Sequence, residues 1–116
     1  MRTILIAISL VTLSAATAFA GDEIMAGFYG NTVVTKGGRA ETHTYYNADH
    51  TFTMKAPAFG REWKGTWKVA GGQFCRDFEK APPGVTSPFC TPAEAHKVGD
   101  TWTVEGRTAS LVQGIQ

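Results

Sequence analysis

Three histidines and two cysteines are the residues of this chain best suited to metal or redox chemistry. His43 and His50 lie on either side of Asp49, and imidazole and carboxylate groups are common ligands of Zn²⁺. A metal site needs three or four converging donors, whereas a turn at residues 47–50 would leave the two histidines about 20 Å apart by strand rise. His96 is expected at the surface. We therefore predict no metal site, and we interpret His43 and His50 as exposed strand and turn residues.

No serine or carboxylate stands in a recognisable catalytic arrangement. Ser87 and Ser110 lack the Gly-x-Ser-x-Gly context of a nucleophile elbow. The acidic residues are scattered, and the glycines fall at expected hairpins, not in a phosphate-binding loop followed by Lys and a helix. We therefore predict no catalytic residues, no cofactor and a protein that is not an enzyme.

The spacing of the two cysteines favours a structural disulfide. Cys75 and Cys90 are too far apart for a Cys-x-x-Cys redox motif. In an exported chain two thiols usually pair, because the compartment is oxidising. The bridge would close a loop of about 15 residues and restrict the unfolded chain by roughly 3 kcal/mol.

Aromatic side chains are the candidates for a binding surface. They either fill the core or line a pocket for an apolar molecule, and we expect core positions for Phe52, Trp67 and Trp102. Residues 80–89 lie next to Cys90 and form the loop best suited to touching another protein. The residues that we expect to contact a ligand or partner are Trp63, Tyr45, Phe78, Pro83 and Phe89.

Short strands must position these side chains. The clearest one covers residues 63–69, where Trp63, Gly65, Trp67 and Val69 share one face and polar residues share the other. Six more strands are expected, at residues 31–36, 39–47, 51–55, 73–79, 101–105 and 108–115. One or two helical turns are expected within residues 22–29.

This pattern predicts an all-β fold. Short strands at regular spacing with glycine-rich turns are typical of a barrel or sandwich, and short connections favour neighbouring strands that pair in sequence order. We predict a small antiparallel up-and-down meander of about eight strands, closed or half-open as a lipocalin-like barrel. A barrel of that size holds packed side chains or one small ligand.

Residues 1–20 have the pattern of a secretory signal peptide. Arg2 precedes an apolar run, which ends on Ala18-Phe19-Ala20. The run is too short and too interrupted by Ser and Thr to span a bilayer. We predict cleavage after Ala20, a periplasmic or secreted location, no stable membrane insertion, and one β-barrel-like domain over residues 21–116.

The predicted mature chain carries no net charge. Once Arg2 is removed from the 11 Lys and Arg, ten basic residues stand against 10 Asp and Glu. Nucleic-acid binding requires a concentrated positive surface, so nucleic acid is not an expected partner.

Several short motifs are spread over nearly the whole predicted mature chain. They are Gly30-Asn31-Thr32, Gly65-Thr66-Trp67, the cysteine pair, and Gly99-Asp100 followed by Trp102. In these the chain resembles a group of small secreted proteobacterial domains of uncharacterised function, which have Gly-Asn-Thr, Gly-x-Trp and two cysteines. The resemblance implies a lipocalin-like barrel and an exported protein, and it implies no catalytic residues.

A second resemblance is to small periplasmic inhibitors of secreted metalloproteases, which are also exported, eight-stranded and closed by one disulfide. In those proteins the cysteines lie nearer the N-terminal half, whereas here they lie in the C-terminal half.

Three hypotheses about function follow. The first is a periplasmic binding module for a small apolar ligand or a protein partner. The second is an inhibitor of a secreted protease, which would insert a terminal segment or a loop into the protease cleft, with residues 21–25 as the natural terminal segment. The third is a structural envelope protein without a ligand.

Overall fold

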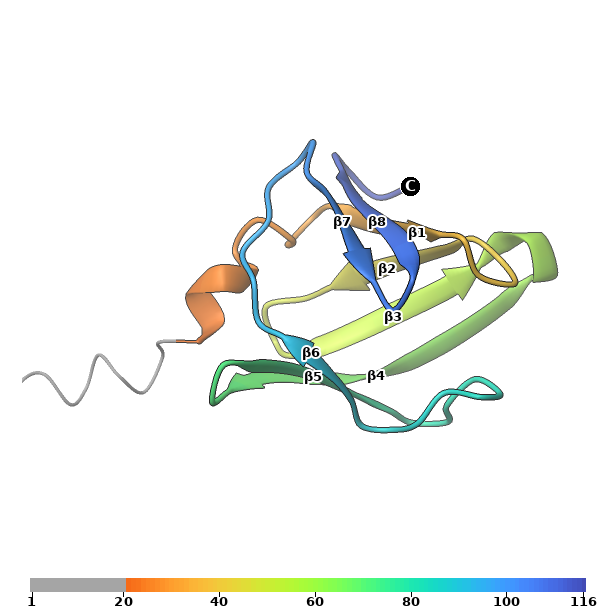
Figure 1. Ribbon diagram of the computed structural model, residues 1–116, viewed down its shortest axis with the longest axis horizontal. Helices are drawn as coiled ribbons and strands as arrows, with labels where there is room; N and C mark the ends of the chain where they lie inside the picture. The colour runs from red at the N-terminus through yellow and green to blue at the C-terminus, as the bar shows by residue number, and fades with distance from the viewer. Residues whose placement is uncertain (1–20) are drawn as a thin grey trace, which may run out of the picture.

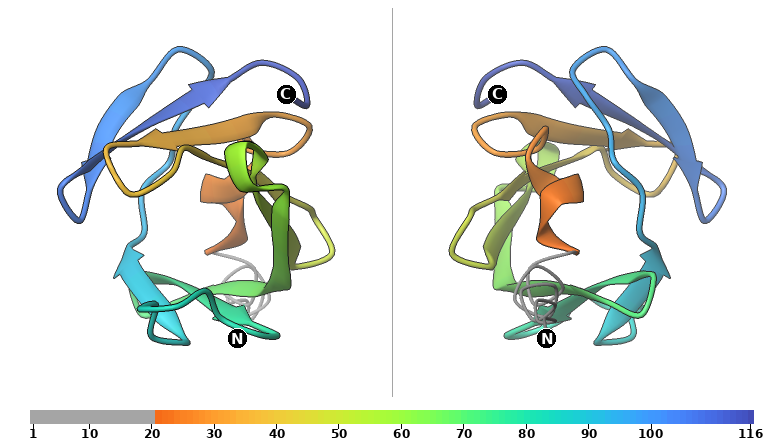
Figure 2. Two further views of the ribbon diagram at one scale, coloured as in Figure 1. Left: turned by 90° about the vertical axis from the view of Figure 1, so that its right-hand side faces the viewer. Right: turned by 90° about the vertical axis from the view of Figure 1, so that its left-hand side faces the viewer.

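The computed structural model describes residues 21–116, which form one sheet of eight antiparallel strands rolled into a nearly closed barrel (Figures 1 and 2). The predicted signal peptide, residues 1–20, lies outside the described residues. The strands are β1 (Thr32–Lys36), β2 (Thr42–Tyr46), β3 (Thr51–Ala56), β4 (Arg61–Ala70), β5 (Gln73–Phe78), β6 (Phe89–Pro92), β7 (Thr101–Val104) and β8 (Arg107–Val112). Two short 3₁₀ helices, η1 (Asp22–Met25) and η2 (Pro57–Phe59), complete the elements.

The strand order confirms the predicted meander. Neighbours in the sheet run β6-β5-β4-β3-β2-β1-β8-β7, so each strand pairs with the next in sequence except β6 with β7. The last strand, β8, pairs with the first, β1, with Val33 opposite Leu111. The unpaired edges, β6 and β7, are joined by residues 93–100, which makes this a half-open barrel.

One strand was not predicted from the sequence. Phe89 to Pro92 form β6, although Phe89 was assigned to the loop after residue 79. The segment is short, follows Pro88 and ends at Pro92. Because proline is uncommon within strands, the sequence did not indicate a strand here. Pairing with β5 and the cross-strand disulfide stabilise it instead.

The predicted disulfide between Cys75 and Cys90 is present, and it joins β5 to the unpredicted strand β6. Cys75 and Cys90 lie directly opposite each other in the register of the two strands, with an S–S bond of 2.06 Å. The bridge therefore ties the edge strand β6 to the sheet and closes the loop of residues 79–88.

The core lies at the end of the barrel that receives the N-terminal segment. Phe52 is 1% exposed and Trp67 2%, as their predicted core positions require, and Trp102 is half-buried against the same cluster. Met25 and Phe28 enter the barrel from the segment that precedes β1 and are buried there. In the end-on views of Figure 2 this segment lies within the outline of the ring of strands, and Figure 1 shows η1 at one end of the barrel.

The Gly-Asn-Thr motif fastens the C-terminal residues to the start of β1. The Asn31 side chain donates to the Gly27 carbonyl at 2.9 Å and accepts from the Gly114 backbone N–H at 3.0 Å. The Thr32 hydroxyl donates to the Gly114 carbonyl at 2.7 Å and accepts from the Gln116 N–H at 2.9 Å. These bonds secure β8 beside β1.

The helices of the described part of the chain are too short to cross a membrane.

Candidate functional site

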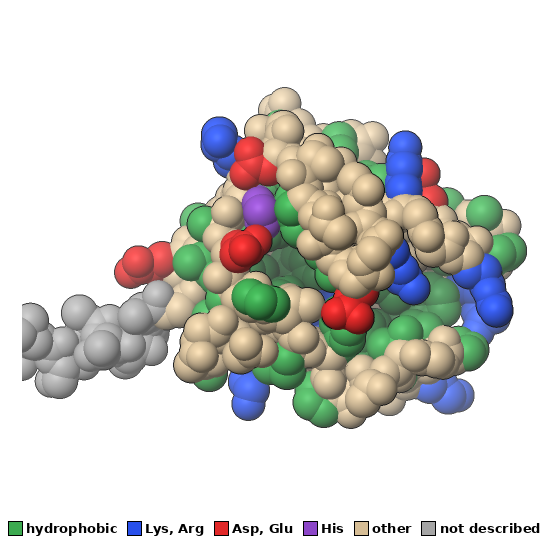
Figure 3. Space-filling model, viewed as in Figure 1, with side chains coloured by type: hydrophobic (Ala, Val, Ile, Leu, Met, Phe, Trp, Pro, Cys, Tyr) green, Lys and Arg blue, Asp and Glu red, His purple; other side chains and the backbone are tan. Residues whose placement is uncertain are grey.

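A cavity of about 540 Å³ lies inside the barrel. Its volume is in the usual range for small-molecule sites, which is roughly 300–1,000 Å³. Aromatic rings from five parts of the chain form much of its wall: Phe28, Tyr46, Phe74, Phe78, Phe89 and Trp102. In space-filling representation, the molecule is hollowed between the β7–β8 hairpin and β6, and hydrophobic side chains are visible inside (Figure 3). The opening of the barrel therefore leads into this cavity.

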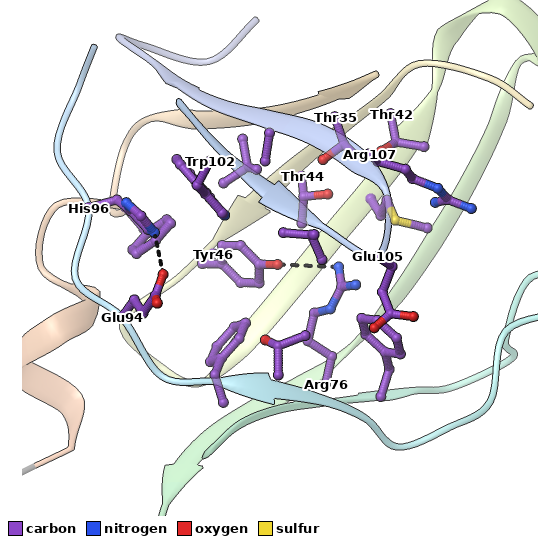
Figure 4. A pocket seen from close by; sticks show the side chains of 18 of the residues that line it. Thr35, Thr42, Thr44, Tyr46, Arg76, Glu94, His96, Trp102, Glu105 and Arg107 are labelled. Carbon is purple, nitrogen blue, oxygen red and sulfur yellow. Dashed lines mark hydrogen bonds and ion pairs between the residues drawn. The ribbon is translucent and has the colours of Figure 1, made fainter. Parts of the chain in front are cut away.

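Alternation along β5 places a positive charge on the inner face of the barrel. Phe74, Arg76 and Phe78 share that face and all line the cavity. The Arg76 guanidinium donates to the Tyr46 hydroxyl, with 3.3 Å between Nη1 and the oxygen. It is the centre of the polar part of the site (Figure 4).

Aromatic rings hold this guanidinium in place. Arg76 Cζ lies 5.3 Å from the ring centre of Phe89, 5.5 Å from that of Phe78 and 5.8 Å from that of Phe52. A cation is attracted to the faces of aromatic rings at such distances. Within residues 21–116 the ion pairs shorter than 4.0 Å do not include Arg76.

Strand β2 adds hydroxyl groups to the same space. Thr42, Thr44 and Tyr46 alternate onto its inner face and line the cavity. Thr44 is 2% exposed, and its hydroxyl makes none of the side-chain hydrogen bonds found in the described part of the chain. Buried hydroxyls are usually hydrogen-bonded, so Thr44 retains bonding capacity toward the cavity.

His96 forms part of the rim, on the segment that joins β6 to β7. Its ring stacks on Trp102 with centroids 3.6 Å apart and planes 7° apart. Its Nε2 lies 3.4 Å from Glu94 and its Nδ1 3.4 Å from Asp100. His96 was expected at the surface, and the structure places it at the rim with a partly buried side chain, 14% exposed.

The carboxylate of Asp100 stabilises this segment. It accepts a hydrogen bond from the Lys97 backbone N–H at 3.1 Å. That bond, followed by those from the Lys97 and His96 side chains, lowers the pKa of Asp100 below its usual value.

Two of the five residues expected to contact a ligand line the cavity. They are Phe78 and Phe89, which lie beside Arg76. The other three do not line it. Tyr45 is on the outer face of β2, where its hydroxyl donates to the Gln116 carbonyl at 2.6 Å.

Trp63 and Pro83 also lie away from the cavity. Trp63 is half-buried on β4, with the Arg61 guanidinium 5.6 Å from its ring centre. Pro83 is exposed in the loop between β5 and β6, although its neighbours Gly84 and Val85 do line the cavity.

The other two histidines make local contacts. His50 stacks on Trp67 with centroids 4.1 Å apart, and its Nε2 lies 2.8 Å from the Asp22 carboxylate. His43 lies 2.7 Å from the Glu41 carboxylate, and its hydrogen bond lowers the pKa of Glu41. Over residues 21–116, no three side chains of the His, Cys, Asp or Glu type converge as metal ligands would.

Three residues of the site were not predicted from the sequence: Arg76, Tyr46 and Thr44. A signal for Arg76 was present, because period-two alternation puts it on the face of Phe74 and Phe78. A charged residue flanked in this way is unusual on an inner face. No comparable signal distinguished Tyr46 from Tyr45, because the register of a strand with polar residues on both faces depends on its partners.

Comparisons of the chain with protein-family models, with curated proteins and with solved structures found no match.

Proposed function

We propose that this chain is an exported, periplasmic binding protein that takes a small, mainly apolar ligand into the cavity of its barrel. The observation that carries the proposal is the cavity of about 540 Å³, walled by aromatic side chains and open between β6 and β7. Apolar walls with a few convergent polar groups are typical of small-molecule sites.

Export is proposed on two grounds. The sequence of residues 1–20 has the three parts of a secretory signal peptide. The disulfide between Cys75 and Cys90 suits an oxidising compartment. The resemblance to small secreted proteobacterial domains, noted above from the sequence motifs, implies the same location.

The other two hypotheses have less support from the geometry. A protease inhibitor of the kind considered above needs residues 21–25 to protrude, whereas Met25 is 2% exposed and packs inside the barrel. A purely structural role gives no reason for the open cavity.

The test is a fluorescence titration with N-phenyl-1-naphthylamine, a neutral apolar probe that becomes bright in apolar surroundings. We expect saturable binding to residues 21–116. Replacing the cavity-lining Thr44 by Phe should abolish or strongly weaken binding, because the ring fills part of the space.

The matched control is Thr53→Phe, the same change on the outer face of the adjacent strand β3. It should bind the probe like the unmodified chain. Thermal unfolding of both variants checks that each is folded. Absence of saturable binding, or equal binding by Thr44→Phe while folded, would refute a cavity-binding function.

A further inference from the structure

Arg76 is a cation whose binding capacity is largely unused within the described chain. A guanidinium has five N–H donors, and the side-chain hydrogen bonds of residues 21–116 include only one from Arg76, to Tyr46. The rings of Phe52, Phe78 and Phe89 stabilise the charge. They accept no hydrogen bond from the N–H groups, which lie in the plane of the guanidinium. The site therefore offers positive charge and free donors to whatever occupies the cavity.

Tyr46 adds a second donor at the same place. Its phenol oxygen accepts the hydrogen bond from Arg76, which leaves its own O–H proton to be donated. Tyr46 is 6% exposed, so this proton points into protein or cavity instead of bulk water. Thr44, two residues away on the same face of β2, places another hydroxyl against the cavity (Figure 4). A guanidinium with neighbouring hydroxyls suits an oxyanion.

The rest of the cavity is suited to a hydrocarbon chain. Phe28, Met54, Val85 and Trp102 are among the apolar residues of its wall. A ligand complementary to both parts has one anionic end and one apolar body. A single guanidinium matches a carboxylate in particular, because the two planar groups form paired N–H···O bonds.

Acidic residues at the rim restrict how such a ligand binds. Glu94 and Glu105 are exposed and line the same cavity, and His96 and Arg107 lie among them. The carboxylates would repel an anionic head left at the rim. The head is therefore favoured inside the cavity beside Arg76.

We infer that the barrel binds an amphiphile that has a single carboxylate head and an apolar chain, with Arg76 and Tyr46 contacting the carboxylate. This inference rests on the proposed cavity-binding function and specifies the chemical class of its ligand.

The experiment is displacement of N-phenyl-1-naphthylamine from residues 21–116 by four molecules with the same chain and different heads: dodecanoate, dodecan-1-ol, dodecyltrimethylammonium and dodecyl phosphate. We expect dodecanoate to displace the probe at roughly tenfold lower concentration than dodecan-1-ol, since hydrogen bonds to a charged group are stronger than neutral ones. The ammonium compound should be weaker still.

The variant Arg76→Met replaces the charged side chain by an uncharged, apolar one of similar length. In the folded variant it should lose the preference for dodecanoate over dodecan-1-ol, measured as the ratio of their displacement concentrations, so that a change in probe affinity affects both ligands equally. Arg76→Lys should retain part of the preference, because it keeps the charge without the planar fork. The control Lys55→Met, on the outer face of β3, should retain all of it.

A further variant tests the effect of the rim. Glu105→Gln removes a carboxylate from the rim and should leave dodecanoate binding equal or stronger, never weaker. Arg107→Met tests whether the exposed arginine of the rim, and not Arg76, supplies the charge. Loss of the preference in Arg107→Met alone would overturn the assignment.

Failure of this inference is distinguishable from failure of the proposed function. If the probe binds and the unmodified chain does not prefer dodecanoate to dodecan-1-ol, the carboxylate inference is wrong and the cavity function stands. Stronger displacement by dodecyl phosphate than by dodecanoate would also overturn the carboxylate assignment. If the probe itself does not bind, the cavity function has failed.

Discussion

The absence of a Cβ at Gly65 leaves room for the ring of Phe52. The two residues are paired across β3 and β4, and a Cβ built on Gly65 would come within 2.8 Å of Phe52 Cε1 and would also meet the Asp77 backbone carbonyl. Phe78 pairs with Gly65 from the other side, and its ring packs edge-on against Phe52 with centroids 5.1 Å apart. The glycine of the Gly-x-Trp motif thus makes room for the aromatic wall of the cavity.

Gly65→Ala should therefore destabilise the protein by about 1–3 kcal/mol, the usual cost of overpacking a tight site. Urea unfolding followed by tryptophan fluorescence measures it. Gly60 has open space around its own Cβ position, but its positive φ of 62° would strain alanine. A better control is Ala58→Ser in η2, which is exposed and should change stability by less than about 0.5 kcal/mol. Equal stability of Gly65→Ala and the unmodified chain would contradict this packing.

Removing the disulfide should loosen the edge of the barrel. The double variant Cys75→Ala/Cys90→Ala should lose about 2–4 kcal/mol, because the closed loop no longer restricts the unfolded chain. Urea unfolding of the variant beside the unmodified protein, with and without reductant, measures the loss. Reductant should affect only the unmodified protein. A sensitivity of the double variant to reductant would mean that the effect does not come from this bridge.

Phe28 lines the cavity and is buried, so its truncation should be costly. It is 6% exposed, and its ring packs edge-on against Tyr46, His96 and Trp102. Phe28→Ala should cost roughly 3–5 kcal/mol, as large-to-small changes of buried aromatic residues do. Phe59→Ala removes the same ring from a position that is 57% exposed, and it should cost far less. Similar unfolding midpoints for the two variants would show that Phe28 is not part of the core.

Acid should weaken the segment that bears His96, through Asp100. The folded-state pKa of Asp100 is lowered from 3.8, chiefly by the hydrogen bond from the Lys97 backbone N–H. A depressed pKa means that the carboxylate adds stability above its ordinary pKa and loses it as the pH falls through the folded-state value. The unmodified chain should therefore exceed Asp100→Asn in stability at neutral pH, and the difference should shrink below about pH 4.

Urea unfolding over that pH range measures the difference. Glu79→Gln is the control, since Glu79 is exposed and its carboxylate takes no part in the ion pairs of residues 21–116. It should show the same acid dependence as the unmodified chain. A gap between Asp100→Asn and the unmodified chain that stays constant down to pH 3 would contradict the role given to Asp100.

Much of the fold was predictable, because it depends on local patterns. The alternation of Trp63, Gly65, Trp67 and Val69 predicted β4 and its buried face, and Gly71-Gly72 predicted the turn to β5. Strand β6 was missed because no local pattern indicates it. Phe89–Pro92 has few residues, proline at its end and no alternation of its own, and it is extended because β5 offers it a partner.

The candidate site was less predictable, since its residues are distant in sequence. Tyr46 and Arg76 are separated by 30 positions and meet because β2 and β5 curve round the same interior. Tyr45, and not Tyr46, was the predicted contact residue. The pairing of β2 with β1 and β3 decided that Tyr46 faces inward and Tyr45 outward.

The sequence alone determined the all-β class, the alternation of strands and turns, and the pairing of the two cysteines. These depend on side-chain periodicity, on the residues that favour turns, and on the presence of two cysteines. Only the tertiary structure decided that the barrel stays open between β6 and β7, and that a guanidinium without a carboxylate partner in the described chain faces the cavity. The physical reason is that the curvature of the sheet and the register of its strands bring together residues that are far apart in the sequence. No local sequence pattern indicates such contacts.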